Sequence, residues 1–150
     1  MARRLEGHVF DQTIESRYLG EQQKLLCYTP PSYTPLSSYG VLICQDGSDY
    51  FQLGRLLRQA EELMKEAEIE ETIIIGVPYP SVEERRKRYH PNGEKRNDYL
   101  RFLADELVPF LDEQFSIEPF ATSRTLAGDS LAATVSLLAA LEYLVSLVKS

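Results

Sequence analysis

Three short apolar runs, separated by segments with helical periodicity, most constrain the fold of this chain. The runs are "YGVLICQDG" (39–47), "ETIIIGVPYP" (71–80) and "SRTLAGD" (123–129). Continuous apolar runs of this length are typical of strands that are buried on both faces of a sheet. When such strands alternate with helices, the sheet is parallel, its crossovers are right-handed and helices cover both faces. The sequence therefore predicts an α/β fold.

The other segments complete the order of elements. The imperfect alternation of "HVFDQTIESRY" (8–18) and the short apolar run of "EQQKLLCYTP" (21–30) predict two antiparallel strands at a sheet edge. Helices are expected over the three segments in which apolar residues recur at helical spacing, 49–70, 98–115 and 130–149. We expect Pro109 to kink the second helix, and the polar stretch that ends at Asn97 to form a long loop.

Composition restricts the class of protein. A chain of 150 residues, 43% apolar and 26% charged, is expected to form one globular domain over residues 1–150. A net charge of -7 argues against nucleic acid as a partner, because phosphate binding requires a basic surface. The basic cluster "EERRKRYHPNGEKR" (83–96) is interpreted as a solvated loop, with an anion-contacting loop beside a pocket as the alternative.

No signal-peptide core and no apolar stretch long enough to span a bilayer is present, so we expect a cytoplasmic protein without a membrane partner. Cys27 and Cys44 both lie in apolar, strand-like runs. There a free thiol behaves as a small hydrophobic group. Their spacing predicts neither a disulfide framework nor a metal site, and no cofactor is expected.

The stretch "GDSLA" (128–132) follows the third apolar run and opens the last helix. A nucleophile elbow holds a serine at a tight strand-to-helix turn, with small residues two positions before and after it. Gly128 and Ala132 occupy these positions, although the usual motif ends in glycine. The pattern indicates Ser130 as a nucleophile. The alternative is a helix N-cap at Asp129 or Ser130, and an elbow serine can serve both roles.

An acyl-transfer site also needs backbone donors for the oxyanion. The N–H of Leu131, directly after the serine, is one candidate donor. The N–H of Ser48 is the other, because its loop "QDGSDY" (45–50) follows another buried strand and falls at the same edge of the sheet. Gly47 would allow the backbone to approach closely.

Several motifs together resemble the putative esterase family, which includes esterase D, enterochelin esterase and the antigen 85 mycolyltransferases. They occur in the family's order from about Tyr28 to Tyr143: "YTPPSY", "YGVLICQDGSDYF", "IIIGVPYP", "ERRKRYHPNG", "YLRFLADELVPFLDEQF" and "RTLAGDSLAATVSLLAALEY". The resemblance implies an α/β-hydrolase-like sandwich with a mostly parallel sheet and antiparallel amino-terminal edge strands. It implies a serine esterase that cleaves a small-molecule carboxylic ester through an acyl-enzyme on Ser130, with Ser48 and Leu131 as the oxyanion donors.

The base and the acid of a triad follow the serine in this fold. After Ser130 the chain has only Glu142 as an acid and no histidine. His8 is expected to be a polar residue of the edge strand, and His90 follows the second buried strand, but the family's histidine comes from elsewhere. We therefore expect that the carboxy-terminal part is missing, that this truncated chain is inactive or weak, and that the cut sheet favours a homodimer.

Three other interpretations of the sequence differ from this one. "GDSL" is also the signature of the GDSL (SGNH) hydrolases, but there it lies near the amino terminus and pairs with a late Asp-x-x-His that this chain lacks. Ser146 and Lys149 have the S-x-x-K spacing of β-lactamases without the companion motifs. The remaining alternative is a non-catalytic remnant of a hydrolase that binds a small acylated molecule or a partner chain.

Overall fold

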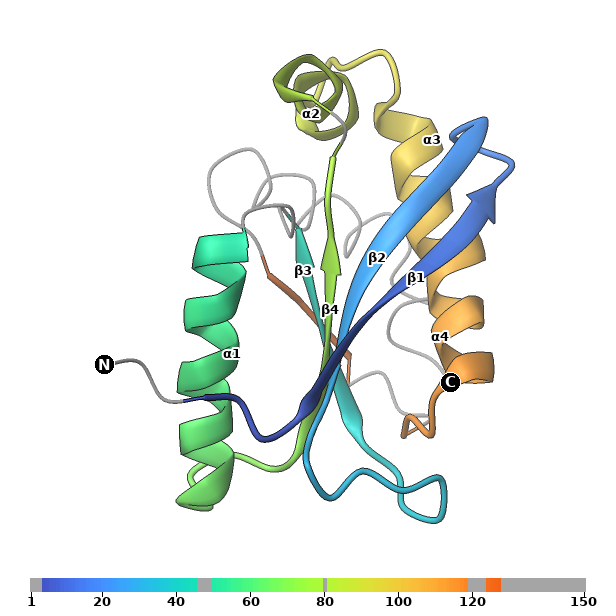
Figure 1. Ribbon diagram of the computed structural model, residues 1–150. Coiled ribbons are helices and arrows are strands. Elements are labelled where there is room, and N and C mark those ends of the chain that lie inside the picture. Colours follow the sequence, from blue (N-terminus) through green and yellow to red (C-terminus); the bar gives the residue numbers. More distant parts are fainter. Residues whose placement is uncertain (1–3, 46–49, 80, 119–123, 128–150) are drawn as a thin grey trace.

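The computed structural model describes residues 4–45, 50–79, 81–118 and 124–127. Within these residues a five-stranded sheet has the order β1-β2-β4-β3-β5 (Figure 1). The strands are β1 (His8–Ser16), β2 (Glu21–Thr29), β3 (Gly40–Gln45), β4 (Thr72–Val77) and β5 (Arg124–Ala127). Strands β4, β3 and β5 are parallel to one another, whereas β2 pairs antiparallel with β1 and β4. The predicted antiparallel amino-terminal pair and parallel strands are both confirmed.

The helices lie on both faces of the sheet. They are α1 (Tyr50–Lys65), α2 (Val82–Tyr89), α3 (Arg96–Arg101), the π-helix η1 (Phe102–Leu107) and α4 (Val108–Gln114). Figure 1 shows α1 on one side of the strands and α3 to α4 on the other. The chain passes from β3 to β4 through α1, and then returns past β3 to β5 through the other helices. Right-handed crossovers that run in opposite directions place their helices on opposite faces.

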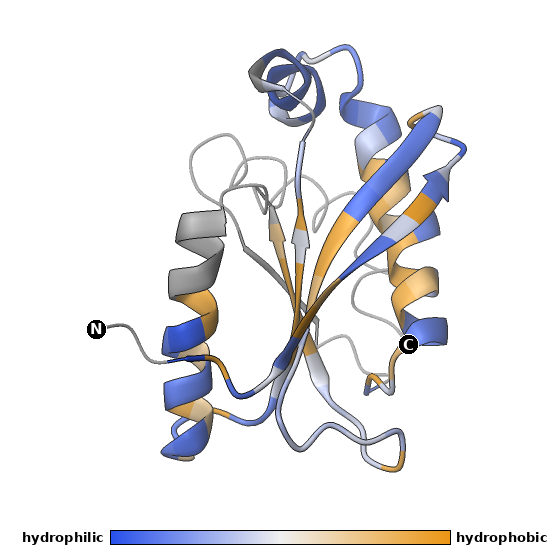
Figure 2. Cartoon of the chain, in the orientation of Figure 1, coloured by the Kyte–Doolittle hydropathy of each residue, from blue (hydrophilic) through white to orange (hydrophobic). Residues whose placement is uncertain are grey.

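The sheet is apolar on both faces because its central strands alternate between two cores. In β4, Ile73, Ile75 and Val77 belong to the core that includes α3, η1 and α4. Ile74 points the other way, into the core that contains Leu57 of α1. None of these four β4 side chains is exposed to solvent. Figure 2 shows the same arrangement as an apolar band along the central strands, between helices that are polar on their outer sides.

The expectation of a long loop up to Asn97 is wrong, because that stretch contains α2 and the start of α3. Ser81 caps α2 by accepting a hydrogen bond from the Glu84 N–H, at 3.1 Å. Acidic residues lie in the first turn of α2, and basic residues in the last. Both the cap and this order of charges stabilise a helix, since they complement its dipole. The charge run is therefore helical despite its polarity.

The second predicted helix also differs in detail. Helical structure is continuous from α3 to α4, and η1 occupies the turns before Pro109. The Val108 N–H donates to the Leu103 carbonyl five residues earlier. Pro109 has no N–H to donate to a carbonyl in the preceding turn. A π-helical segment therefore directly precedes the position at which Pro109 was expected to kink the helix.

A buried carboxylate joins the amino-terminal segment to α1. Glu61 of α1 is 3% exposed and accepts hydrogen bonds from the backbone N–H groups of Glu6 and Gly7 and from the Tyr28 hydroxyl. A Cβ at Gly7 would lie 2.5 Å from the Thr29 carbonyl oxygen, so glycine is needed for this close approach. Among the described residues, no helix combines the length and the apolar character needed to cross a membrane.

Candidate active site

The carboxyl ends of the three parallel strands lie at one edge of the sheet. Gln45 of β3 is in register with Val77 of β4, and Cys44 of β3 is in register with Ala127 of β5. From this edge, β3 continues toward α1 on one face, while β4 continues toward the helices of the other face. Where adjacent strands send their connections to opposite faces, a crevice opens that binds ligands in α/β proteins. This edge is the candidate active site.

The residues predicted to perform the chemistry lie outside the described residues. These are Ser130, Leu131 and Ser48, together with their neighbours Gly47, Gly128 and Ala132. The strands that lead to them are described. Because Cys44 and Ala127 are partners across β3 and β5, the chain enters both predicted loops from neighbouring strands. The roles of the three residues stay predictions.

His90 lies at the C-cap of α2, at the candidate edge. Its Nδ1 accepts a hydrogen bond from the Asn92 N–H at 3.0 Å. A neutral imidazole with an accepting Nδ1 carries its proton on Nε2. A triad base needs the opposite tautomer, in which Nδ1–H donates to a carboxylate and Nε2 accepts the serine proton. In this arrangement His90 does not serve as a triad base.

His8 lies at the opposite edge of the sheet. It is exposed and begins β1, the predicted edge strand, where it pairs with Thr29 at the end of β2. Since β2 runs antiparallel to β4, with Leu26 opposite Gly76, the end of β2 lies toward the amino end of β4. His8 is therefore remote from the carboxyl ends that form the candidate site.

The described residues at the candidate edge come mainly from the segment after β4 and from α2. In Figure 1, α2 lies beyond the end of β4. Tyr79 is half-buried there, two residues after the last residue of β4. Its ring makes an edge-to-face contact with Tyr89, with ring centroids 6.3 Å apart. The guanidinium of Arg85 lies 5.8 Å from the centroid of the Tyr79 ring and 5.4 Å from that of Tyr89.

The interpretation of residues 83–96 as a solvated loop is wrong at Arg88, because the side chain of this residue is fully buried. Its Nη1 donates to Gln23 Oε1 at 2.8 Å, and its Nη2 donates to Glu21 Oε1 at 2.6 Å. Its Nε lies 3.4 Å from Glu84 Oε2, and its guanidinium lies 5.7 Å from the centre of the Tyr99 ring. A planar fork of donors can satisfy several acceptors at once, which explains how an arginine is accommodated here.

Arg88 and its partners Gln23, Glu21 and Glu84 form a cluster that also holds the backbone at the candidate edge. Gln23, which is 4% exposed, donates through Nε2 to the Pro78 carbonyl at 2.7 Å and to the Lys24 carbonyl at 2.9 Å. Pro78 directly precedes Tyr79. The segment after β4 is thus tied to β2 by a side chain that Arg88 itself holds.

Glu84 completes the cluster and is charged at neutral pH. Burial by itself would raise the pKa of the Glu84 carboxyl. The hydrogen bond from Lys95 Nζ, at 2.8 Å, and the positive charges of Lys95, Arg88 and Lys87 outweigh burial and lower the pKa below its ordinary value. The α2 region is therefore held by ion pairs on both sides of Glu84.

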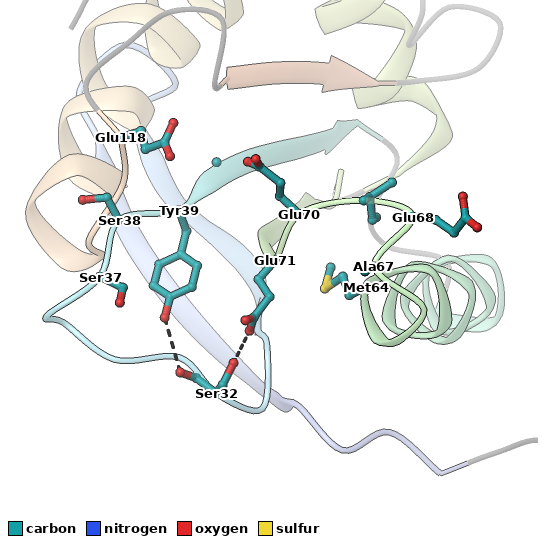
Figure 3. A pocket seen from close by; sticks show the side chains of 12 residues that line it. Ser32, Ser37, Ser38, Tyr39, Met64, Ala67, Glu68, Glu70, Glu71 and Glu118 are labelled. Carbon is teal, nitrogen blue, oxygen red and sulfur yellow. Dashed lines mark hydrogen bonds between the residues drawn. The ribbon is translucent and has the colours of Figure 1, made fainter.

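An acidic cavity of about 730 Å³ lies at the other edge of the sheet (Figure 3). Gly40, which starts β3, and Glu71, which precedes β4, belong to its lining. Figure 3 shows Tyr39 and Glu71 both directed toward Ser32, and both are hydrogen-bonded to it. Within the described ranges, no group of three or more His, Cys, Asp or Glu side chains could hold a metal ion. This cavity is separate from the candidate active site.

Sequence comparison identifies relatives along most of the chain. The model of the family described as "Putative esterase" matches residues 16–146. The Bacillus subtilis protein YjcH is 53% identical over 137 residues, which are 91% of this chain and 57% of YjcH. The Bacillus subtilis protein YbbA is 24% identical over 139 residues, covering 85% of this chain and 54% of YbbA. The chain spans about half the length of these relatives.

Solved structures share the fold at low sequence identity. Enterochelin esterase from Shigella flexneri superimposes with a TM-score of 0.82 at 15% identity, covering 97% of this chain and 36% of the esterase. The ferulic acid esterase AmCE1/Fae1A from Anaeromyces mucronatus superimposes with a TM-score of 0.71 at 19% identity, covering 89% of this chain and 53% of that esterase. For the BES protein from Bacillus cereus the TM-score is 0.76 at 22% identity, covering 92% of this chain and 57% of the BES protein. The fold is that of the α/β-hydrolases, as predicted.

Proposed function

We propose, because this chain belongs to the putative esterase family, that it carries the nucleophile half of a serine-dependent carboxylic-ester hydrolase. One observation carries the proposal. The sequence G-D-S-L-A begins directly after β5, whose last residue is paired with β3 at the edge where parallel sheets bind their ligands. The strand, the small residues around Ser130 and the helical periodicity that follows are the context that a nucleophile elbow requires.

In the proposed reaction, the Ser130 hydroxyl attacks the carbonyl carbon of a small-molecule ester. The alcohol leaves and an acyl-enzyme remains, which water then hydrolyses to the carboxylic acid. The N–H groups of Leu131 and Ser48 are proposed to stabilise the oxyanion of each tetrahedral intermediate. One such donor typically contributes about a 100- to 1,000-fold increase in rate.

The proton of Ser130 needs an acceptor. The chain has no histidine after Ser130, and the geometry of His90 does not suit a triad base. We therefore propose that the 150-residue chain alone turns over esters slowly. The oxyanion donors and substrate binding alone still accelerate hydrolysis over water in serine hydrolases that lack a triad member, so weak activity is expected rather than none.

A fluorophosphonate probe tests the proposal, because its phosphorus is a much stronger electrophile than an ester carbonyl and so reports a nucleophilic serine even where ester turnover is slow. We expect labelling at Ser130, confirmed by peptide mass spectrometry, and a fall of at least about 100-fold in the labelling rate for Ser130→Ala. Ser146→Ala, a change in the same carboxy-terminal segment, is the matched control and should react like the wild type. Equal labelling of the wild type and Ser130→Ala would instead support the non-catalytic alternative, in which the chain only binds an acylated molecule or a partner.

A further inference from the structure

We infer that Tyr79 is a specificity-determining residue, whose ring forms one wall of the substrate site and favours esters that carry a planar aromatic group. This inference rests on the proposed function, because it assumes that the ester is cleaved at the carboxyl edge of the parallel strands. It assigns a role to a residue for which the strand pattern alone gave no signal.

The position of Tyr79 follows from the topology. Val77 ends β4 opposite Gln45, so the chain leaves β4 beside the point where β3 ends. The connection after β3 leads to one face of the sheet and the connection after β4 leads to the other. Tyr79 lies in the second connection, two residues from the sheet edge. A ligand in the crevice between these connections would lie beside the Tyr79 segment.

Tyr79 is the accessible end of a row of aromatic rings. The row continues through Tyr89, Tyr99 and Phe102, with successive centroids 6.3, 5.3 and 5.8 Å apart. Tyr89 is 1% exposed and the next two rings are not exposed at all, whereas Tyr79 is only half-buried. Among these four described rings, Tyr79 is therefore the one that a ligand can reach, and a further ring there would extend the existing series of aromatic contacts.

The Tyr79 ring is held in place before any ligand binds. The Pro78 carbonyl, in the preceding peptide, accepts a hydrogen bond from Gln23, and Gln23 is held by the buried Arg88. The guanidinium of Arg85 lies over the rings of both Tyr79 and Tyr89, which restrains Tyr79 from the α2 side. A preorganised wall loses little conformational freedom on binding, so contact with it contributes to affinity.

Two sulfonyl fluorides that differ only in a ring test the inference. Phenylmethanesulfonyl fluoride and methanesulfonyl fluoride both react with a serine hydroxyl: the oxygen–sulfur bond forms, the sulfur–fluorine bond breaks, and fluoride and a proton are released. For each reagent, the second-order rate constant is measured on the wild type, Tyr79→Phe, Tyr79→Ala and Tyr18→Ala. Tyr18 is the matched control, because it is also half-buried with guanidinium groups 5.7 and 5.8 Å from its ring centre, but it lies on the β1–β2 turn.

We expect Tyr79→Ala to lower the ratio of the phenylmethyl to the methyl rate constant by about 3- to 10-fold, the range expected for loss of one aromatic contact. This fall in the ratio should come from a higher half-saturating concentration of the aromatic reagent, and the limiting rate should stay unchanged. Tyr79→Phe and Tyr18→Ala should keep the wild-type ratio. An equal fall for both reagents would mean that Tyr79 only maintains structure, and an unchanged ratio would overturn the inference.

Failure of the proposed function can be distinguished from failure of the inference about Tyr79. If neither reagent modifies Ser130 in the wild type, the esterase proposal fails, and binding then tests Tyr79 by itself. Saturation-transfer NMR with phenylmethanesulfonate and methanesulfonate should show that the wild type prefers the aromatic anion and that Tyr79→Ala loses this preference. Absence of any preference in the wild type would overturn the inference. Circular dichroism and a urea midpoint verify that each variant is folded.

Discussion

The two cysteines show how burial determines the chemistry of a side chain. Cys27 lies in the core on one face of the sheet and is 1% exposed, and Cys44 lies in the core on the other face and is 6% exposed. Burial raises the pKa of each thiol to about 12, and Asp11 adds to this effect at Cys27. Both thiols thus stay protonated and behave as small apolar groups, as the surrounding apolar runs predicted.

Stability should therefore fall in alkaline solution. Below pH 9 both thiols are protonated in the folded and the unfolded chain, and their contribution to stability is complete. Between about pH 9 and 12 the unfolded chain loses protons that the folded chain keeps. The free energy of unfolding then falls by up to about 1.4 kcal/mol per pH unit for each thiol.

Urea unfolding at pH 8, 9 and 10 measures this effect. The double variant Cys27→Ala/Cys44→Ala lacks both thiols but keeps every other titrating group, so its free energy of unfolding should decrease less steeply with pH than that of the wild type. Parallel curves for the two proteins would contradict the assignment of the alkaline loss to these thiols.

Among the elements, the strands were predictable and the arrangement of α2 was not. The runs at 40–45 and 72–77 form strands because nearly every residue in them can be buried on one face or the other. The start of α2 also had a signal, because Ser81 and Glu84 have the spacing of a capping box. The segment that follows this signal is highly charged and lacks apolar residues at helical spacing, so its polarity predicts a loop.

The burial of Arg88 had no local signal at all. Its partners Glu21 and Gln23 are 67 and 65 positions away in the sequence. Neither the periodicity nor the charge of α2 distinguishes Arg88 from its neighbour Arg86, which is exposed. The position of Tyr79 is likewise defined only by the pairing of β4 with β3. The nucleophile could be proposed from sequence because its motif is local, whereas the wall of the site depends on contacts between distant segments.

The cluster around Arg88 should hold α2 against the sheet. Arg88→Ala removes the fork that binds Glu21 and Gln23 and leaves Glu84, 18% exposed, with Lys95 as its remaining close partner. Breaking a buried ion pair typically costs about 3–5 kcal/mol. Glu21 is 42% exposed and can be rehydrated, so we expect a loss near the lower limit, about 3 kcal/mol.

Urea unfolding of two alanine variants of the same helix tests this expectation. The exposed Arg86 provides the matched control, and Arg86→Ala should change the free energy of unfolding by less than about 0.5 kcal/mol. Arg88→Lys should fall between Arg88→Ala and the wild type, since an ammonium restores the charge but not the planar fork. Equal effects of Arg86→Ala and Arg88→Ala would show that the cluster contributes nothing specific.

In the molecule as a whole, two helical layers share one sheet. The α1 layer packs on side chains that alternate, residue by residue, with those that support α3 to α4. Neither layer has a set of strands of its own. A perturbation on one face therefore reaches the other through the backbone of the same strand, and we expect the described parts of the chain to unfold as one cooperative unit.

Neighbouring residues of β4 test this cooperativity. Ile74 packs toward α1 and Ile75 toward α3 to α4, and both are fully buried, so Ile74→Ala and Ile75→Ala should each lower the free energy of unfolding by about 2–5 kcal/mol. Leu36→Ala, at a side chain that is 96% exposed, should change it by less than about 0.5 kcal/mol. In both core variants the urea transitions followed by far-ultraviolet circular dichroism and by tyrosine absorbance should coincide. Separate transitions in Ile74→Ala would mean that the two helical layers do not unfold as one unit.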